Sequence, residues 1–527
     1  MAHDLIIIGG GHNGLVTAAY AARAGLRVVV LERRQVLGGA CVTEEPWRGF
    51  KVSTAAYVNS LLRPEIIRDL ELKRHGFAML PRSPSSFTPF PDGRSLMLGP
   101  DKELTHREVS KFSRKDADAL PRYEAMLERV AAFIEPTLVQ TPPTPWSLRP
   151  RDLMQLGKLG LGFLKLGRHA ADAVEILTGP ATPILDRWFE SEQLKVTLAT
   201  DAVIGAWASP SMPGTAYVLF HHVMGECDGV RGVWGYVRGG MGGISNAIAA
   251  SAREYGAEIR TNALVARILT RGGRVEGVVL SDGTELRAPR VASGVDAHTT
   301  FLKLMDATQL PEEFAQRVRT LDYTSGSLKI NLGLSALPNF TGLPGASAGP
   351  QHRGTIHLCP TRDYIEEAFN EARSGRPASN PIVEATIPSV LDDTIAPKGM
   401  HVMSMFTQYF PYDVRNGDHE QLKERYADRC IELMDSYAPG FKQSVVHREV
   451  LAPRDIESRF GLTGGNIMQG TMGLNSLFFM RPVPGYADYR TPITGLYMCG
   501  AATHPGGGVM GACGYNAARE ILRDGRR

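Results

Sequence analysis

The chain opens on short aliphatic runs and glycines that predict a strand, a turn, a helix and a second strand. Residues 4–8 are mostly aliphatic and are followed directly by the glycine-rich stretch 9–14. Small and apolar residues continue over 15–24, and a second aliphatic run over 28–31 ends at Glu32. Short aliphatic runs on either side of a helix-length segment are typical of a βαβ unit in a parallel sheet.

Hydrophobic spacing predicts further elements along the chain. Apolar residues at helical spacing predict helices, whereas short apolar runs bounded by turn residues predict strands. The expected helices are 116–133, 244–255, 364–373, 419–437 and 514–522. The expected strands are 258–260, 265–269, 275–280, 285–288, 328–334, 402–406 and 495–500. The strands within 265–288 are separated by glycine turns and therefore predict a β-meander.

The first turn carries the spacing of a dinucleotide-binding fingerprint. Gly9 allows the tight turn, Gly11 allows a pyrophosphate to approach the backbone, and Gly14 allows the helix to pack closely on the strand. The helix then directs its free N–H groups and the positive end of its dipole at the phosphates. Glu32 is placed where a carboxylate binds ribose hydroxyls. The pattern therefore predicts a dinucleotide site.

Two later glycine clusters favour FAD over NAD as the dinucleotide. Gly38 and Gly39 lie just beyond Glu32, where a long cofactor would need further backbone contacts. Near the end of the chain, the strand 495–500 leads into the glycine-rich loop 501–511 and then a helix. Such a helix start stabilises negative charge, as on a reduced flavin. No second fingerprint of comparable quality indicates a separate NADPH domain.

The order of these elements predicts an α/β protein of two domains, as a length of 527 residues also suggests. One is a Rossmann-type FAD-binding domain, discontinuous and containing the β-meander. The other is a substrate domain of mixed sheet and helices. The FAD-binding domain is expected to comprise 1–75, 225–297 and 485–527, and the substrate domain 76–224 and 298–484.

Composition limits the partners, the metal chemistry and the cellular location that we expect. A net charge of +3 provides no reason to expect nucleic acid as a partner. None of the six cysteines forms a CxxC pair, which argues against a metal site and against a reductase with vicinal thiols. A reducing, cytoplasmic location is the simpler expectation. The first apolar run is too short for a signal peptide, and no stretch approaches the ~20 apolar residues of a membrane span.

The segment 149–169 combines basic and apolar residues. It contains five Lys and Arg residues against one acid, Asp152, interleaved with leucine, methionine and phenylalanine. Such a segment can lie on a membrane surface as a peripheral contact. Its four glycines would weaken a helix. A cap over a substrate pocket is the alternative expectation.

The motifs match a known family over nearly the whole chain. They are the stretches 8–15, 31–34, 37–39, 239–243 and 503–509. With them the sequence resembles the phytoene desaturase-like FAD oxidoreductases of the flavin amine oxidase superfamily.

The resemblance implies a non-covalent FAD and assigns it a set of contacts. The adenosine and pyrophosphate end would contact Gly9, Gly11, Gly14, Glu32, Gly38 and Gly39. The adenine would meet the backbone at Val265. The ribityl chain and isoalloxazine would run along Gly500, Ala501, Gly508, Val509 and Met510. Carotenoid desaturases of the family usually carry arginine where this chain has Ala40, which argues against a carotenoid substrate.

Two residues are candidates for catalysis. Lys329 is similar in place to a lysine of flavin amine oxidases that binds water at flavin N5. Strand alternation would direct it away from Leu328 and Ile330, toward either a cavity or a solvated sheet face. His504 titrates in the useful range and could accept a proton or adjoin the flavin. The proline and glycines around it also suit a structural turn.

The resemblance implies an FAD-dependent oxidoreductase that takes hydride from a carbon centre. An apolar, isoprenoid-like small molecule is the first choice of substrate. A flavin amine oxidase that forms an imine and hydrogen peroxide is one alternative. An FAD-binding protein with an isomerase or partner-binding role is the other.

Overall fold

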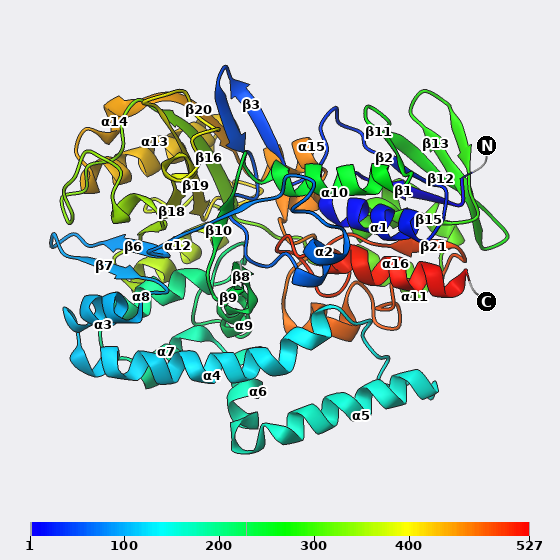
Figure 1. Cartoon of the computed structure of the whole chain (residues 1–527), viewed down its shortest axis with the longest axis horizontal. Coiled ribbons are helices and arrows are strands. Elements are labelled where there is room, and N and C mark those ends of the chain that lie inside the picture. The colour runs from blue at the N-terminus through cyan, green and yellow to red at the C-terminus, as the bar shows by residue number, and fades with distance from the viewer. Residues whose placement is uncertain (1–2, 228, 526–527) are drawn as a thin grey trace.

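A computed structural model describes residues 3–227 and 229–525, and it places two main sheets beside each other with helices around both (Figure 1). The first sheet is parallel, with strand order β11-β2-β1-β15-β21. Its strands are β1 (Leu5–Ile8), β2 (Val28–Leu31), β11 (Glu258–Arg260), β15 (Val291–Ser293) and β21 (Leu496–Met498).

The parallel sheet is covered on both faces, which explains the uninterrupted aliphatic sequences of β1 and β2. In β1, Leu5 and Ile7 pack toward one face, and Ile6 and Ile8 pack toward the other. Helices α1 (His12–Arg23), α10 (Gly242–Glu254) and α16 (Ala512–Asp524) cover the first face. The meander β12 (Val265–Arg271), β13 (Arg274–Leu280) and β14 (Glu285–Arg287) covers the second face with α11 (Glu312–Arg319).

The second sheet has seven strands in the order β20-β16-β19-β18-β17-β6-β7. All neighbours are antiparallel except the parallel pair β17 and β6. Its strands are β6 (Ser86–Pro89), β7 (Ser95–Leu98), β16 (Ser327–Leu334), β17 (Thr355–Leu358), β18 (Ile382–Thr386), β19 (His401–Gln408) and β20 (Val445–Leu451). Every residue of β16 is buried, so this strand lies in the interior of the protein.

The remaining elements surround or connect the two sheets. Short strand pairs are β3 (Thr43–Trp47) with β4 (Phe50–Ser53), β5 (Met79–Pro81) with β10 (Gly235–Val237), and β8 (Glu226–Cys227) with β9 (Val230–Arg231). The other helices are α2 (Pro64–Asp69), α3 (Lys102–Ser110), α4 (Arg114–Leu138), α5 (Pro150–Lys165), α6 (Ala170–Thr178), α7 (Ala181–Trp188), α8 (Glu192–Asp201), α9 (Thr215–His221), α12 (Arg362–Arg373), α13 (His419–Tyr437), α14 (Phe441–Ser444) and α15 (Pro453–Phe460).

The two sheets draw their strands from alternating parts of the chain. All strands of the parallel sheet come from 1–75, 225–297 and 485–527, and all strands of the second sheet come from 76–224 and 298–484. The β3–β4 hairpin nevertheless packs against the second sheet, through contact of Phe50 and Val52 with Val402. The expected domain boundaries therefore stay a prediction.

Helix α5 differs from its expectation, because its glycines do not prevent a helix. Proline at the first position starts it, and α4 supports it from one side. A Cβ built on Gly162 would lie 3.1 Å from Phe133 Cε2, so this glycine allows the two helices to approach. Tertiary contact thus outweighs the low helix propensity of glycine. In Figure 1, α5 extends along the outside of the molecule.

Three features of the described part of the chain concern membranes, metal ions and thiols. There, no helix has the length and hydropathy to cross a bilayer. No cluster of three or more His, Cys, Asp or Glu side chains in the described residues could hold a metal ion. All six cysteines are buried, and Cys41, Cys359, Cys430, Cys499 and Cys513 are free thiols.

Candidate functional site: a cofactor cavity joined to a larger cavity

The glycine turn after β1 has the geometry that the fingerprint requires. Gly9 adopts a φ of +91°, which side chains rarely tolerate. A Cβ on Gly14 would lie 2.4 Å from the Gly9 carbonyl oxygen, so only glycine allows α1 to pack this close to the turn. Helix α1 begins at His12, and its N-cap, Gly11, offers no side-chain acceptor to the first N–H groups. These groups are therefore available to a ligand.

Glu32 holds this turn together from the end of β2. Its carboxylate is 6% exposed and accepts hydrogen bonds from the backbone N–H of Gly10 at 2.7 Å and of Arg34 at 2.8 Å. Glu32 also lines a cavity that begins at the glycine turn. The acid thus has a structural contact in addition to its predicted place beside a ribose.

Most of the residues expected at the cofactor line this one cavity. They are Gly9, Gly11, Gly14, Glu32, Gly38, Gly39, Ala501, Gly508, Val509 and Lys329. The cavity therefore runs from the glycine turn of the parallel sheet to β16 of the second sheet. Ala40, which replaces the arginine usual in carotenoid desaturases, also lines it.

Four expected residues lie outside the lining of this cavity. Val265 is buried at the start of the meander, paired with Leu280. Gly500 packs against the Gly294 carbonyl, which a Cβ would approach to 2.3 Å. Met510 is buried, and its carbonyl accepts a hydrogen bond from the Arg63 N–H at 3.1 Å. The fourth residue, His504, is described below.

His504 is occupied by structural contacts. Its ring Nε2 lies 2.9 Å from the carbonyl oxygen of Thr137 in α4, and its own carbonyl accepts from the Tyr489 hydroxyl at 2.8 Å. Burial lowers its pKa to about 4, so the ring is neutral near pH 7. These contacts fit the structural turn that its proline and glycines suggested.

Lys329 lies in the wall of the cofactor cavity and has no hydrogen-bonding partner among the described residues. The side chain is 3% exposed, so the alternative of a solvated sheet face is wrong. Its Nζ lies 4.5 Å from the centroid of the Tyr57 ring, a cation–π distance. Burial lowers its pKa to about 7, against the opposing charge of Glu449.

Strand register aligns Lys329 with three other side chains across the second sheet. Lys329 pairs with Phe406, Phe406 pairs with Glu384, and Glu384 pairs with His357. Residues directly opposite each other on neighbouring strands share a face, so these four form one row. We call them the cross-sheet row.

Tyr57 covers the cross-sheet row. Its ring stacks on Phe406 with centroids 5.9 Å apart, and its hydroxyl donates a long hydrogen bond of 3.5 Å to Glu384 Oε2. On the other side of Glu384, His357 Nδ1 lies 3.7 Å from Oε1. Tyr57 therefore links the lysine end of the row to its carboxylate end.

A second cavity of about 660 Å³ adjoins the cofactor cavity. The two share five lining residues, Ala56, Tyr57, Met468, Gly508 and Val509. Apolar side chains from α4, α8 and α9 form much of its wall, including Leu120, Leu127, Leu198 and Leu219. Its size is within the range of ligand pockets in proteins.

The larger cavity also has a polar side. Glu384 and His357 of the cross-sheet row face it, together with Arg82 and Asp201. Arg82 is 4% exposed, and its Nη1 donates to the Thr355 hydroxyl at 2.7 Å. Asp201 accepts no hydrogen bond and forms no ion pair within the described chain, and burial raises the pKa of its carboxyl. The cavity can therefore contact polar as well as apolar groups.

The loop shared by both cavities is held in place by one buried arginine. Arg481 is 2% exposed and donates to the carbonyls of Ala501 at 2.8 Å, Thr471 at 2.9 Å and Met468 at 2.6 Å. Val509, in the same loop, has a φ of +58°, which is rare for a β-branched residue. Strained backbone of this kind is found preferentially at functional sites.

Sequence reasoning missed Tyr57, Glu384, His357 and Asp201. One signal is present in β18, where Glu384 interrupts the apolar run 382–385, because charged residues are rarely buried unless they are paired. Tyr57 follows a run of small residues and carries no local signal. Only its contacts across the fold distinguish it.

The comparisons with known proteins identify the family. A model described as flavin containing amine oxidoreductase matches residues 14–335. This chain belongs to the flavin-containing amine oxidoreductase family. The family resemblance and the α/β fold predicted from the sequence are thereby confirmed, and the chain is an oxidoreductase of a flavin-dependent type.

The chain is also similar to individual proteins. The chain is 48% identical to pyridine nucleotide-disulfide oxidoreductase domain-containing protein 2 of Rattus norvegicus, over 99% of this chain and 94% of the rat protein. It is 23% identical to phytoene desaturase (lycopene-forming) of Pantoea ananas, over 96% of each. Among solved structures it is similar to putrescine oxidase bound to putrescine, with a TM-score of 0.60, 16% identity and full coverage of both chains.

The residues of the cofactor cavity fit a flavin dinucleotide. A Cβ on Gly11 would meet only the Gly38 carbonyl, at 3.9 Å, so this glycine leaves an open space beside the start of α1. At the far end, the buried Lys329 Nζ has no hydrogen-bond partner within the described chain. A buried amine without a hydrogen-bond partner is explained most simply by a polar group of a ligand that binds in the cavity.

Proposed function

We propose that the protein is an FAD-dependent oxidoreductase that takes hydride from a carbon centre of a largely apolar substrate. The observation that carries this proposal is the junction of the two cavities. A dinucleotide bound at the glycine turn would reach toward Lys329, where the cofactor cavity meets the larger, mostly apolar cavity. FAD, when bound, would accept the hydride.

The residues around the junction would perform three tasks. The glycine turn and α1 would bind the phosphates, and Gly38 and Gly39 would support the cofactor further along. The loop held by Arg481 would set the position of the ring system. Burial of the junction would exclude water and orient the substrate, which raises the rate by fixing its distance from the acceptor.

Anaerobic titration of the FAD-loaded protein tests this function. Isoprenoid lipids, other apolar compounds with an oxidisable carbon, and amines would be added stepwise while the visible flavin absorbance is recorded. We expect an isoprenoid-like or other apolar compound to bleach the flavin in stoichiometric amounts. A protein that binds no FAD, or bound FAD that none of these compounds bleaches, would contradict the proposal.

A second candidate, an amine oxidase that forms an imine and hydrogen peroxide, is favoured by the polar groups at the junction. Lys329 is buried beside the cavity as in the family resemblance, and Glu384 and Asp201 could attract a cationic substrate. The two functions differ in products. Bleaching by amines alone, followed by oxygen uptake and peroxide release, would favour the amine oxidase.

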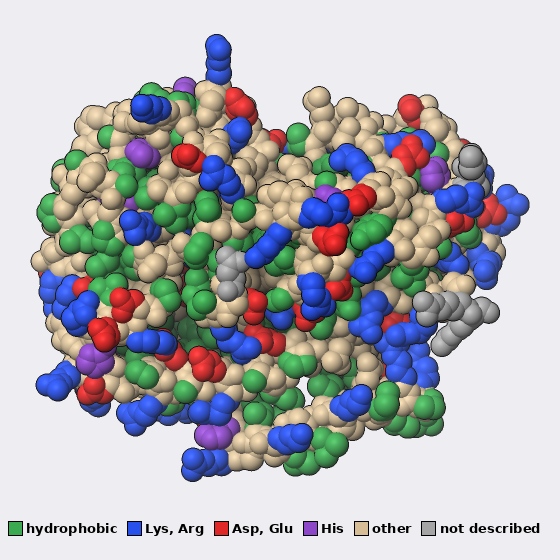
Figure 2. All heavy atoms as spheres, in the orientation of Figure 1, with side chains coloured by type: hydrophobic (Ala, Val, Ile, Leu, Met, Phe, Trp, Pro, Cys, Tyr) green, Lys and Arg blue, Asp and Glu red, His purple; other side chains and the backbone are tan. Residues whose placement is uncertain are grey.

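We also propose that α5 binds the surface of an anionic membrane. Its outer side carries an apolar ridge, Leu153, Met154, Leu161 and Leu164, which are 50–74% exposed and recur at helical spacing. Trp146 and Leu148, just before the helix, are also exposed. In Figure 2, hydrophobic side chains and Lys and Arg side chains lie together in the region where Figure 1 places α5.

The charges on α5 support a lipid surface rather than a cap over the substrate. Lys158 and Lys165 of α5, and Arg168 just after its end, are exposed and form no hydrogen bond or ion pair with any described residue. Free cations beside an apolar ridge complement anionic headgroups above an acyl layer. No described residue of 149–169 lines either of the two joined cavities.

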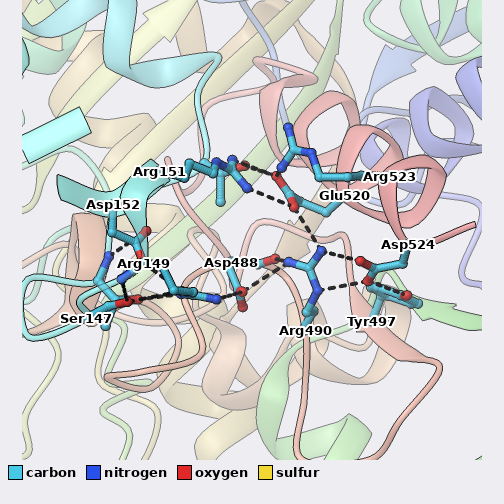
Figure 3. A network of polar contacts seen from close by, with 12 residues as sticks. Ser147, Arg149, Arg151, Asp152, Asp488, Arg490, Tyr497, Glu520, Arg523 and Asp524 are labelled. Carbon is cyan, nitrogen blue, oxygen red and sulfur yellow. Dashed lines mark hydrogen bonds and ion pairs between the residues drawn. The ribbon is translucent and has the colours of Figure 1, made fainter. Parts of the chain in front are cut away.

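The N-terminal end of α5, around Arg151, is the base of this helix, and a network of charged residues fixes it to the protein (Figure 3). Arg151 pairs with the fully buried Glu520 of α16 at 2.8 Å. Arg490 joins the same network through Glu520 and Asp524, at 3.0 and 2.8 Å. Burial would raise the pKa of Glu520, but hydrogen bonds from Arg151 and Thr141 lower it to about 2. The network stabilises the base of α5 while its ridge stays exposed.

The double variant Leu161→Glu/Leu164→Glu is expected to bind vesicles at least about 100-fold more weakly than the unmodified protein. The membrane would bury both leucines, so their loss costs roughly 3 kcal/mol of binding free energy, and about 1.4 kcal/mol corresponds to a tenfold change in affinity. Co-sedimentation with phosphatidylglycerol-containing vesicles measures the effect, with pure phosphatidylcholine as the uncharged comparison. Leu264→Glu, an exposed leucine on another part of the surface, is the matched control. An unmodified protein that stays in the supernatant with both vesicles would contradict membrane binding.

A further inference from the structure

His221 is a buried histidine whose ring packs against Tyr217 and His222 but forms no hydrogen bond with any described residue. It is the last residue of α9, is 3% exposed, and both ring nitrogens lack a hydrogen bond to any described residue. The next residue, His222, differs, since its Nδ1 lies 2.8 Å from the Val218 carbonyl. Buried polar groups nearly always have a partner, so each exception requires an explanation.

The ring of His221 lies against the loop that the two cavities share. A Cβ on Gly508 would lie 2.9 Å from His221 Nε2, and Gly508 lines both cavities. The backbone of Gly507, which lines the cofactor cavity, is close enough to favour the charged ring without meeting hydrogen-bond geometry. His221 itself lines the larger cavity. Its imidazole is therefore at the passage between the two.

We propose that His221 hydrogen-bonds an oxygen or nitrogen atom of the substrate at the end that enters the junction of the two cavities. This inference rests on the proposed function and narrows its substrate class. The substrate would be amphipathic, with an apolar body against the leucines of the larger cavity and a hydroxyl, carbonyl or amine group near the carbon that is oxidised.

The chemistry of the ring suits such a contact. Burial and the neighbouring His222 lower the pKa of His221 to about 3, so the ring is neutral at pH 7. A neutral imidazole donates from one nitrogen and accepts at the other, and can therefore pair with any of the three groups. The same cavity wall contains Arg82, Glu384 and Asp201, which could form further polar contacts with the substrate.

A histidine with a structural role is expected to form hydrogen bonds through its ring nitrogens. His352 is a buried histidine with both nitrogens bonded, to the Gly349 N–H at 3.1 Å and the Pro338 carbonyl at 2.8 Å. A histidine kept for the fold is expected to resemble His352. His221 forms no such bond within the described chain and is expected to lower stability, because its ring loses water without gaining a partner.

The first test compares the thermal stability of two variants of the FAD-loaded protein. His221→Phe is expected to melt at the same temperature as the unmodified protein or higher. His352→Phe, the matched control, is expected to melt several degrees lower because it leaves two buried groups unpaired. If the melting temperature of His221→Phe falls as far as that of His352→Phe, the His221 ring has a structural role and the inference is wrong.

The second test measures ligand preference with three probes of equal chain length: decanol, decylamine and decane. Binding is followed by the change in flavin absorbance. The unmodified protein is expected to bind decanol or decylamine about 10-fold more tightly than decane. His221→Phe should abolish this preference, and His221→Gln should retain part of it. Equal affinity for the three probes, or no binding of either polar probe, would contradict the inference.

The two proposals can fail separately. A protein that binds no FAD, or that is bleached by none of the compounds in the titration, contradicts the proposed function. A protein that binds FAD and is bleached by a pure hydrocarbon, with His221→Phe as active as the unmodified protein, contradicts only the role of His221.

Discussion

Replacement of Gly11 by valine is expected to leave the fold intact and to weaken FAD binding by at least about 100-fold. Gly11 has φ −67° and ψ 161°, an extended conformation that valine adopts readily. The Cβ of the new side chain would meet only the Gly38 carbonyl, at 3.9 Å, among the described residues. It would instead project into the cofactor cavity, beside the free N–H groups of α1. Overlap with a ligand and loss of its backbone contacts together cost roughly 3 kcal/mol.

Visible absorbance and thermal melting together measure this effect. The Gly11→Val protein should be purified without its yellow colour and should melt at a temperature close to that of the unmodified apoprotein. Gly14→Ala offers a contrast, since its Cβ would strike the Gly9 carbonyl at 2.4 Å and should reduce both stability and FAD binding. Gly157→Val, on the exposed side of α5, is the neutral control. Normal FAD content in Gly11→Val would show that the cofactor binds elsewhere.

Replacement of Lys329 by methionine is expected to stabilise the protein most at and below pH 7. The lysine has an ordinary pKa of 10.5 in the unfolded chain and about 7 when buried in the folded protein. Between these values the unfolded state binds one proton more, so the unmodified protein gains stability as pH rises from about 7 to 10.5. Below pH 7 the full cost of charging a buried amine is present, roughly 5 kcal/mol as an upper bound. Methionine removes this cost while preserving side-chain volume.

Urea unfolding from pH 6 to pH 10 measures the prediction. The stability difference between Lys329→Met and the unmodified protein should be largest near pH 6 and should shrink toward pH 10. Lys423→Met is the matched control, because Lys423 is buried but paired with Glu420 and Asp455, and its pKa is raised. That variant should lose stability. A pH-independent difference for Lys329→Met would mean that the amine is solvated.

The same variant tests the proposed role of Lys329 at the cofactor. Loss of a positive charge beside the bound flavin is expected to slow reoxidation by oxygen. Stopped-flow mixing of the reduced protein with oxygenated buffer measures the rate, with Lys423→Met again as the control. An unchanged rate for Lys329→Met would remove the role in reoxidation and leave the stability prediction unaffected.

The glycine turn could be predicted from the sequence because its geometry is local. The positive φ of Gly9 and the close approach at Gly14 depend on residues within one βαβ unit. The spacing of Gly38, Gly39 and Gly508 was also visible. Spacing does not determine whether Val265, Gly500 and Met510 line the cavity, because this depends on how they pack in the folded protein.

The face occupied by Lys329 could be predicted, but its burial could not. Alternation along β16 directs the lysine away from Leu328 and Ile330, whatever covers the sheet. Tyr57, more than 250 residues away in sequence, provides the cover. For His504 the decisive contact is with Thr137, 367 residues earlier, and no local pattern indicates it.

The sequence by itself determined the βαβ fingerprint, the family and the flavin-type chemistry, because these depend on short-range spacing and backbone conformation. Only the tertiary structure decided which side chains meet at the junction of the two cavities. The cross-sheet row depends on the register of four strands, and a slip of one residue in any strand would turn its side chain to the other face. His221 can be recognised only in the folded protein, where its buried ring nitrogens form no hydrogen bond with any described residue. A missing contact is a property of the packed interior, and no pattern along the chain records it.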